Sequence, residues 1–389
     1  MDFGAFPFGV PFSIQQRLPS NPHILARFPL RLTQNAIIPC LLLFRGLLQN
    51  GNLGLAASVT SNISPVICVR GSSAVFGSRL IPSEQIDRAF GMPEGKLRDR
   101  AGIVSLAYVS EGEQEIDLAV RAAYGALQAS DMQAKDIDWL LATSETHRGY
   151  PSLAAQLHAR LQLRANCGAL DIGGACLGLL NAFEVAAALL RLGPASKVLI
   201  VTADVHSRIL VPGRVPGEFG GLFGDGASVF LLSLGDGGFV SPFYSLGGLF
   251  FGCASQYAGA IRLSDGEEGK INLVFDGEAL SRAAITKLAE LIAGIESRSG
   301  ISRFDAGAFA THQPNPRLVA LLARQLGLPP DRFPPVAQTR GNLGSSTCGA
   351  ALHEAIVRTS ADKPAPIFLA SLGPGLLTGA GWIVPETKK

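Results

Sequence analysis

The sequence lacks the features that mark several large classes of protein. Its 33 Lys and Arg residues nearly balance its 31 Asp and Glu residues, so it has no concentrated basic field of the kind that a dedicated nucleic-acid-binding protein uses. No stretch reaches about 18 uninterrupted apolar residues, because Pro39 and Arg45 interrupt the richest early run, 36–48. We therefore expect a protein that binds no nucleic acid and crosses no membrane.

Paired cysteines are also absent. The six cysteines are scattered and include no C-x-x-C pair, so neither a zinc site nor a disulfide framework is expected, and a reducing cytoplasm fits best. With 389 residues, of which 47% are hydrophobic and 16% charged, the chain is long enough to bury a large core and to hold more than one domain-sized unit.

Residues 1–65 differ from the rest and show no clean helical or strand period. They contain four arginines, no lysine and one acidic residue, a balance found in transit peptides. Six prolines between Pro7 and Pro39 break the amphipathic helix that such a peptide needs. We expect an atypical extension outside the fold, either disordered or upstream of the true start of translation.

From residue 66 onward, short β-rich runs alternate with amphipathic helical windows, which is typical of an α/β protein. A helical window, a loop with an Asp and a buried run occur twice, over 117–144 and 279–311. This repetition predicts a duplicated unit with halves at 66–235 and 236–386. The β-rich runs of the first half are 66–69, 139–143, 197–202 and 229–232.

One cysteine stands at the predicted start of a helix. In Leu170–Leu180, two glycines lead from a β-rich run into an apolar helix that ends near Leu192, and Cys176 lies at the junction. Unpaired N–H groups and the helix dipole favour a thiolate there, as a nucleophile requires. A structural role is the alternative for any single cysteine in an apolar window. We assign that role to Cys68, Cys167 and Cys348.

Two further polar residues complete a candidate site. His312 follows an apolar run and precedes a helix, and Asn342 lies in a glycine-flanked turn 30 residues later. Each alone is ordinary, since a Gly-Asn pair usually marks a turn. Together with Cys176 they supply a nucleophile and two donors able to stabilise an enolate.

The ordered motifs resemble those of the thiolase-like condensing enzymes and are most similar to ketoacyl-acyl-carrier-protein synthase III. The resemblance covers about 66–386. It implies a five-layered α/β/α/β/α fold with two duplicated halves around two central helices, one of which starts at Cys176. The motifs are the segment 171–178 around the cysteine, FGDGA at 223–227, THQPN at 311–315, RGNLG at 340–344 and the glycine-rich run 371–379.

The resemblance implies an acyltransferase that works in two steps. Cys176 accepts an acyl group from acyl-CoA, and His312 with Asn342 then drives decarboxylation of a malonyl thioester whose enolate attacks the acyl-enzyme. These thioesters are substrates, and no metal or other cofactor is implied. A homodimer is implied, and an acidic carrier protein would dock on Arg317 and Arg324, which share a face of the helix 316–326.

Some positions match the family pattern and others depart from it. Lys96 stands near the place of a tryptophan that stacks on the CoA adenine, whereas Arg100 matches an arginine that contacts the nucleotide end. Glu145 replaces a small residue and corresponds to a general acid/base glutamate of hydroxymethylglutaryl-CoA synthases. Tyr150 lies where an aromatic residue limits the partner's acyl pocket. In the loop Gly-Pro-Gly at 373–375, Gly375 is the expected oxyanion donor because proline has no N–H.

Three other functions stay open on these residues. The enzyme could pass its acyl group to a hydroxyl or amine, as some synthase III-like proteins of secondary metabolism do. It could also condense acyl groups in the manner of a type III polyketide synthase or a hydroxymethylglutaryl-CoA synthase. A catalytically silent binding subunit is disfavoured, because it has no chemical need for Cys176, His312 and Asn342.

Overall fold

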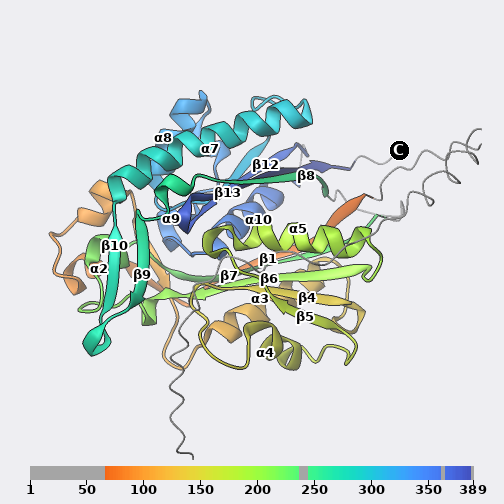
Figure 1. Ribbon diagram of the computed structural model, residues 1–389, viewed down its shortest axis with the longest axis horizontal. Helices are drawn as coiled ribbons and strands as arrows, with labels where there is room; N and C mark the ends of the chain where they lie inside the picture. Colours follow the sequence, from red (N-terminus) through yellow and green to blue (C-terminus); the bar gives the residue numbers. More distant parts are fainter. Residues whose placement is uncertain (1–65, 236–243, 361–363, 387–389) are drawn as a thin grey trace, which may run out of the picture. The chain divides into compact units, whose positions relative to one another are not determined.

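The computed structural model describes residues 66–235, 244–360 and 364–386 (Figure 1). The predictions for residues 1–65 lie outside this part, and the proposed boundary between the halves adjoins the gap at 236–243. The strands are β1 Ile67–Phe76, β2 Arg79–Pro82, β3 Ser105–Tyr108, β4 Trp139–Thr143, β5 Gly168–Asp171, β6 Lys197–Val205, β7 Asp225–Leu234, β8 Tyr244–Cys253, β9 Ile261–Asp265, β10 Ile271–Phe275, β11 Ala308–Thr311, β12 Ile367–Gly373 and β13 Leu377–Pro385. The α-helices are α2 Ser83–Ala89, α3 Glu115–Ala129, α4 Leu153–Arg160, α5 Gly178–Arg191, α6 Gly217–Gly220, α7 Gly277–Ser299, α8 Pro316–Leu326, α9 Val336–Arg340 and α10 Ser346–Ser360.

The strand order repeats within the main sheet, which runs β11-β12-β13-β8-β1-β7-β6-β4-β5. Strands β4 and β6 pair in parallel, while β6–β7 and β7–β1 are antiparallel. The set β11, β12, β13 and β8 repeats this order and these directions. In each set a long helix follows the first strand in the chain and precedes the parallel pair, α3 before β4 and α7 before β11. The predicted duplication is confirmed.

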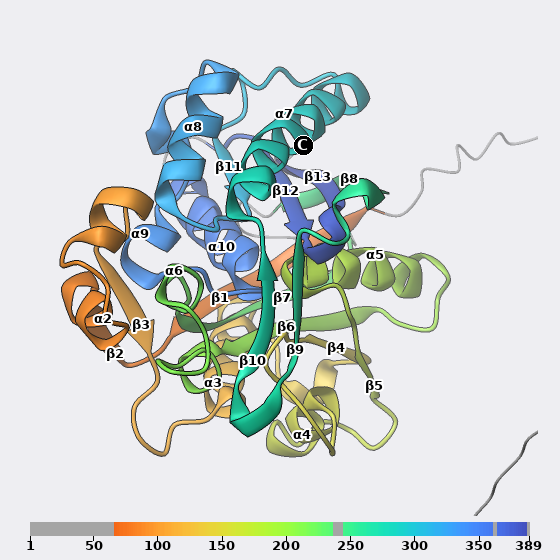
Figure 2. The same ribbon diagram turned by 60° about the vertical axis from the view of Figure 1, so that its left-hand side comes forward.

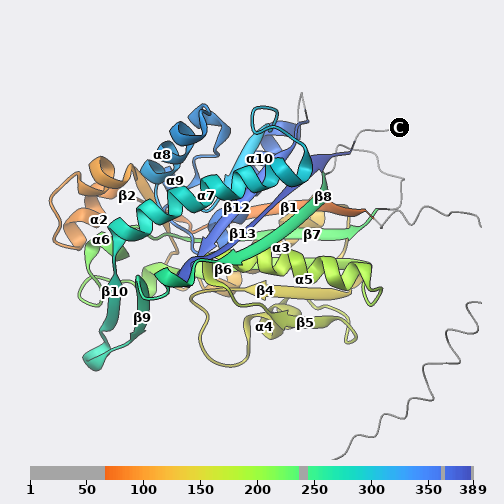
Figure 3. The same ribbon diagram turned by 45° about the horizontal axis from the view of Figure 1, so that its top comes forward.

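The two sets of strands are joined into one sheet. The connection is short: β1 pairs with β8 only at Cys68 with Ser245 and Val69 with Tyr244. The sheet turns at this seam so that its halves lie on either side of α5 and α10 (Figure 1). Helix α7 crosses the outer face over β12 and β13 (Figure 3).

Successive side chains along a strand point to opposite faces of the sheet, and this alternation produces the layers. On β6, Val198 and Ile200 pack with the central helices α5 and α10, whereas Leu199 and Val201 pack with α3. A third cluster lies between α7, α8 and the outer face of the second half. Strands covered on both faces are apolar nearly throughout, and residues 198–205 of β6 are all buried. This gives the predicted five layers.

Helix α8 has the bounds that the sequence predicted. The Asn315 side chain caps it by accepting a hydrogen bond from the Leu318 N–H at 3.0 Å, and Pro316 occupies the first turn, where its missing N–H costs nothing. Gly327 ends the helix in the left-handed conformation at φ +69°. These caps fix the segment directly after His312.

A separate hairpin, β9–β10, projects from the second half (Figure 2). Its residues Ile261, Leu263 and Phe275 line the cavity described below. No helix in the described ranges is long and apolar enough to span a bilayer.

The core between the sheet halves predicts a large effect of one substitution. Phe183 on α5 is fully buried and packs edge-on against Phe230 at 5.4 Å between ring centroids. Phe183→Ala should lower the free energy of unfolding by about 3–5 kcal/mol through lost burial and a cavity, measured by urea denaturation. Leu192→Ala, at a side chain that is 82% exposed, is the control and should change it by less than about 0.5 kcal/mol. Similar losses in both variants would contradict this packing.

Candidate active site

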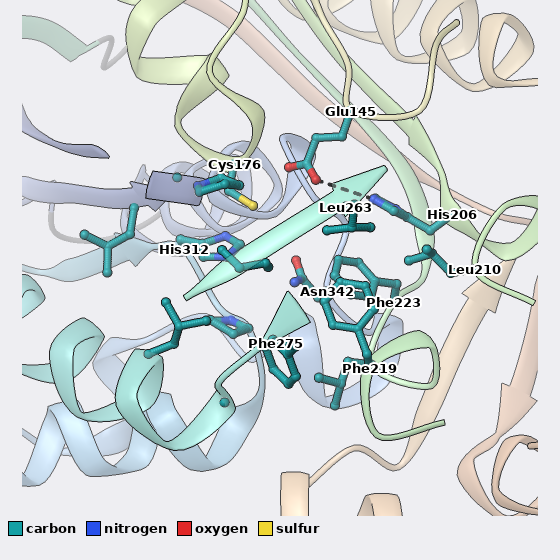
Figure 4. Close-up of a pocket in the computed structure, with 18 of the residues that line it drawn as sticks. Glu145, Cys176, His206, Leu210, Phe219, Phe223, Leu263, Phe275, His312 and Asn342 are labelled. Atoms are coloured by element: carbon teal, nitrogen blue, oxygen red, sulfur yellow. Dashed lines mark ion pairs between the residues drawn. The ribbon is translucent and has the colours of Figure 1, made fainter. Parts of the chain in front are cut away.

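The three residues predicted from separate motifs meet at one cavity of about 220 Å³. Cys176 comes from the turn before α5, His312 from the end of β11 and Asn342 from the turn before α10 (Figure 4). Apolar and aromatic side chains form much of the remaining wall, which suits the acyl or pantetheine part of a thioester. These include Leu210, Phe219, Phe223, Leu263 and Phe275.

A strained turn presents Cys176. Ala175 has φ +50° and Gly174 has φ +130°, and a Cβ at Gly174 would lie 2.3 Å from the Asn181 amide nitrogen. The Ser371 hydroxyl donates to the Cys176 carbonyl at 2.7 Å. Non-glycine residues in the left-handed region cost free energy and persist where their surroundings hold them. Packing from both halves therefore fixes the sulfur at the cavity.

The electrostatics correct one prediction about Cys176. The sequence predicted a thiolate favoured by the helix N-terminus. Instead, burial and then the nearby Glu145 carboxylate raise the pKa of the Cys176 thiol well above its ordinary value. The resting nucleophile is a thiol, so its reaction requires a group that accepts the proton.

His312 is neutral over the physiological range. Burial lowers the pKa of its imidazole to about 4, opposed by Glu145. Its Nδ1 is buried without a hydrogen-bond partner among the described residues. Placing the proton on Nε2 therefore leaves no buried N–H unpaired, and makes Nε2–H the available donor.

Asn342 is oriented by its own turn. Its Oδ1 accepts from the Gly344 N–H and from the Thr347 hydroxyl, both at 3.0 Å. Its backbone bonds Leu222 and Gly224 on the other side. The side-chain oxygen is thus occupied, and the amide nitrogen is the group able to donate.

Glu145 lines the same cavity, held through its backbone. Its N–H donates to Asp204 Oδ1 at 2.6 Å. The other Asp204 oxygen accepts from the N–H and hydroxyl of Ser345 at 2.9 and 2.6 Å. Burial raises the pKa of Asp204 to about 7. His206 opposes this rise, and the Glu145 carboxylate adds to it. This carboxyl links the loop after β4 to the turn before α10.

His206 is a site residue that the sequence analysis missed. It follows β6, lines the cavity, and its Nε2 lies 3.7 Å from Glu145 Oε2 (Figure 4). His312 was selected from the sequence because it follows an apolar run. Polar residues also stand at the end of β6, Asp204 within the strand and His206 directly after it. The predicted β-rich run ended at Thr202, before both residues.

The other predicted contacts lie away from the reacting groups. Arg100 is exposed and does not line the cavity, and Tyr150 is fully exposed. Gly375 adopts φ +80° in its turn, whereas its neighbours Pro374 and Leu376 line the cavity. Lys96, at the expected adenine-stacking position, pairs with Glu218. Their roles in substrate binding stay predictions.

The predicted docking arginines differ in their surroundings. Both Arg317 and Arg324 are exposed on α8. The Arg317 guanidinium donates to the Asp99 carbonyl, which ties α8 to the turn at Leu97–Ala101. Within the described ranges, no three His, Cys, Asp or Glu side chains are grouped to hold a metal ion; that the reaction uses no metal stays a prediction.

Comparison with known proteins agrees with the fold and the site. Residues 170–244 match the family model of 3-oxoacyl-[acyl-carrier-protein] synthase III, and residues 297–384 match its C-terminal model. The 3-oxoacyl-(acyl carrier protein) synthase III of Pseudomonas aeruginosa PAO1 superposes with a TM-score of 0.73 at 22% identity, over 82% of this chain and 98% of that one. The fold and the site define a thiolase-like condensing enzyme, a transferase.

Relatives with similar sequences identify the family within this class. The beta-ketoacyl-[acyl-carrier-protein] synthase III of Ruegeria pomeroyi is 28% identical over 80% of this chain and 97% of its own length. The enzyme of the same name from Rubrobacter xylanophilus is 30% identical over 71% and 86% respectively. The chain therefore belongs to the beta-ketoacyl-[acyl-carrier-protein] synthase III family, which confirms the resemblance inferred from the motifs.

The low pKa of His312 predicts a pH-dependent contribution to stability. The unfolded chain protonates this imidazole near about 6.5, whereas the folded protein keeps it neutral down to about 4. The stability it contributes is complete above the unfolded pKa and is lost as the pH falls from one value toward the other. Between about pH 7 and about pH 4.5, wild type should lose more unfolding free energy than His312→Gln in urea titrations.

The control for this measurement is Leu192→Ala, which changes an exposed side chain that carries no titratable group. It should retain the wild-type slope of unfolding free energy against pH. Equal slopes for wild type and His312→Gln would show that the folded protein protonates His312 as readily as the unfolded chain.

Proposed function

We propose that the enzyme loads an acyl group from an acyl thioester onto Cys176 and then performs a decarboxylative Claisen condensation with a malonyl thioester. The observation that carries this proposal is the meeting of a cysteine, a neutral histidine and an oriented asparagine amide at one cavity. The products would be a 3-oxoacyl thioester, carbon dioxide and the free thiol of the acyl donor.

In the loading step, the Cys176 sulfur attacks the acyl carbonyl carbon. Its proton passes to the Glu145 carboxylate, the group that lies beside it. Backbone N–H groups, including that of Cys176, stabilise the oxyanion. The bond from the carbonyl carbon to the donor sulfur breaks, and the leaving thiolate takes the proton from Glu145. One thioester replaces another with no change of oxidation state.

In the condensation step, the malonyl carbon–carboxylate bond breaks and its electron pair forms a thioester enolate. His312 Nε2–H and the Asn342 amide donate to the enolate oxygen, where negative charge develops. The enolate carbon attacks the acyl carbonyl and expels the Cys176 thiolate, which takes up one proton from solvent water. A neutral donor suits this step, because a charged imidazolium would be costly in so buried a place.

The partners follow from the same reaction. We infer that acyl-CoA is the donor and that a carrier protein brings the malonyl group, with the acidic partner docking at the exposed Arg324 on α8. The free thiols of Cys167, Cys176, Cys253 and Cys348 support a reducing, cytoplasmic setting.

We also propose a homodimer through the edge of the sheet. Strand β5 is the last strand in the sheet order, and Leu170 on it is 41% exposed. An exposed edge strand is a template for pairing with another chain. Tyr150, fully exposed beyond β4, would then reach the acyl pocket of the partner subunit and favour a modest primer.

The separate roles proposed for Cys176, His312 and Asn342 can be tested by intact-protein mass spectrometry with acetyl-, hexanoyl- and dodecanoyl-CoA. Wild type should gain one acyl mass, and Cys176→Ala should gain none. His312→Ala and Asn342→Ala should keep the adduct but lose malonyl decarboxylation by about 100-fold or more, because each removes an enolate donor. His158→Ala on α4 should behave as wild type. Equal loss of acylation in all three site variants would contradict the assignment.

The dimer proposal makes a separate prediction. Leu170→Asp places a charge on the β5 edge and should convert the dimer to a monomer in light scattering coupled to size-exclusion chromatography. Leu192→Asp, at the end of α5 and 82% exposed, is the matched control and should leave the mass unchanged. A dimer that persists in Leu170→Asp at micromolar concentration would argue for a different interface.

A further inference from the structure

His206 is held in one orientation by contacts on several sides. Its ring lies 4.7 Å from the Phe223 ring, tilted by 35°, and its Nδ1 lies 3.2 Å from the Gly224 carbonyl. A Cβ on Gly344 would sit 2.6 Å from His206 Cε1, so this position requires glycine. Because a carbonyl only accepts hydrogen bonds, Nδ1 carries a proton, and Nε2 is left to face Glu145.

Nε2 and the Glu145 carboxylate form a buried pair at the cavity wall. The His206 and Glu145 side chains are 5% and 18% exposed, and the two atoms lie 3.7 Å apart. Neither His206 Nε2 nor Glu145 Oε1 has a hydrogen-bond partner within the described part of the chain. Buried polar atoms without partners are rare and call for an explanation. Here both belong to groups that line the cavity beside Cys176.

The other carboxylates near His206 are already engaged. Asp204 accepts from the Glu145 N–H and from Ser345. Asp225, on β7, accepts from the Val109 N–H and from the N–H and hydroxyl of Ser207. Glu115 on α3, a neighbour of Asp204, accepts from Ser144, Thr146 and His147. By contrast, Glu145 receives no such support on Oε1. Glu145 interacts with the Cys176 thiol and faces His206.

The electrostatics of the pair agree with this geometry. Burial opposes a charged imidazole, but Glu145 and Asp204 raise the pKa of His206 to about 9. Burial alone would raise the pKa of Glu145, but His206 lowers it below its ordinary value. Asp204, Cys176 and His312 are the other titratable groups that interact with Glu145. Near neutral pH the pair is an imidazolium facing a carboxylate.

We propose that His206 is a positioning residue that keeps Glu145 ionised beside Cys176, so that Glu145 accepts the thiol proton during acyl loading. This inference rests on the proposed acyl loading of Cys176. In that step the S–H bond of Cys176 breaks, an O–H bond forms on Glu145, and the same proton leaves with the thiolate of the acyl donor. His206 keeps its protons throughout and contributes charge and orientation.

The test is the pH dependence of acyl-enzyme formation, measured in single turnovers by rapid quenching and intact-protein mass spectrometry. The donor is whichever of acetyl-, hexanoyl- and dodecanoyl-CoA loads wild type best. His206→Asn keeps a donor near the Nδ1 position but cannot carry charge. It should move the acidic inflection of the loading rate up by about one pH unit or more, since an adjacent opposite charge shifts a carboxyl by that amount. His158→Asn is the matched control.

A double-mutant cycle isolates the pair. In Glu145→Gln the acidic inflection should disappear, and adding His206→Asn should produce no further shift. If His206→Asn fails to fold by circular dichroism, His206→Gln, also uncharged, replaces it. A loading rate that falls equally at all pH values in the His206 variant would overturn the inference, as would the same shift in the Glu145→Gln background. Absence of any acyl adduct in wild type would instead overturn the proposed function.

Discussion

The site depends on the burial of two helix starts between the halves of the sheet. Residues 176–180 at the start of α5 and 341–352 at the start of α10 are all buried. A buried backbone needs partners for its free N–H groups, and a buried side chain must be apolar, hydrogen-bonded or functional. The polar groups at these helix starts are therefore either bonded into the structure or directed at the cavity. Cys176 and Asn342 are of the second kind.

The Asp204 carboxyl binds the two halves together at this point. It fixes the loop that carries Glu145 from the first half and the Ser345 turn that follows Asn342 in the second. Neither half alone holds both the nucleophile and the enolate donors. The distances among them depend on the packing of the two halves, and Asp204 is one buried acceptor that fixes it, so errors in this packing would change the geometry of the site.

Local sequence patterns predicted those parts of the molecule that depend on local physics. The strand Trp139–Thr143 and the helix Pro316–Leu326 have the predicted bounds, because an apolar run and an Asn-Pro start are sufficient to define them. The order of motifs brought Cys176, His312 and Asn342 together correctly. The β1–β8 seam could not be predicted, since pairing between strands distant in the chain leaves no periodic signal in either one.

The errors at the site have a common origin in burial. Helix position alone favours a thiolate at Cys176, but burial of the thiol and then the neighbouring Glu145 carboxylate raise its pKa and favour the thiol instead. The sequence reveals neither the burial nor the neighbour. His206 was overlooked for the same reason. A single histidine after a strand is unremarkable until its ring is seen between Phe223, Gly344 and Glu145.

The duplicated architecture also shows how two copies of one unit can diverge. Both central helices begin at the middle of the molecule. In the first copy, that beginning carries a reactive sulfur. In the second, Ser345 and Ser346 form hydrogen bonds with Asp204 and Thr202 of the first copy. The equivalent turn therefore holds the two copies together. The two copies therefore contribute different groups to one cavity, the cysteine from the first and the histidine and asparagine from the second. A substitution that loosened the contact between the copies would separate these groups without removing any of them.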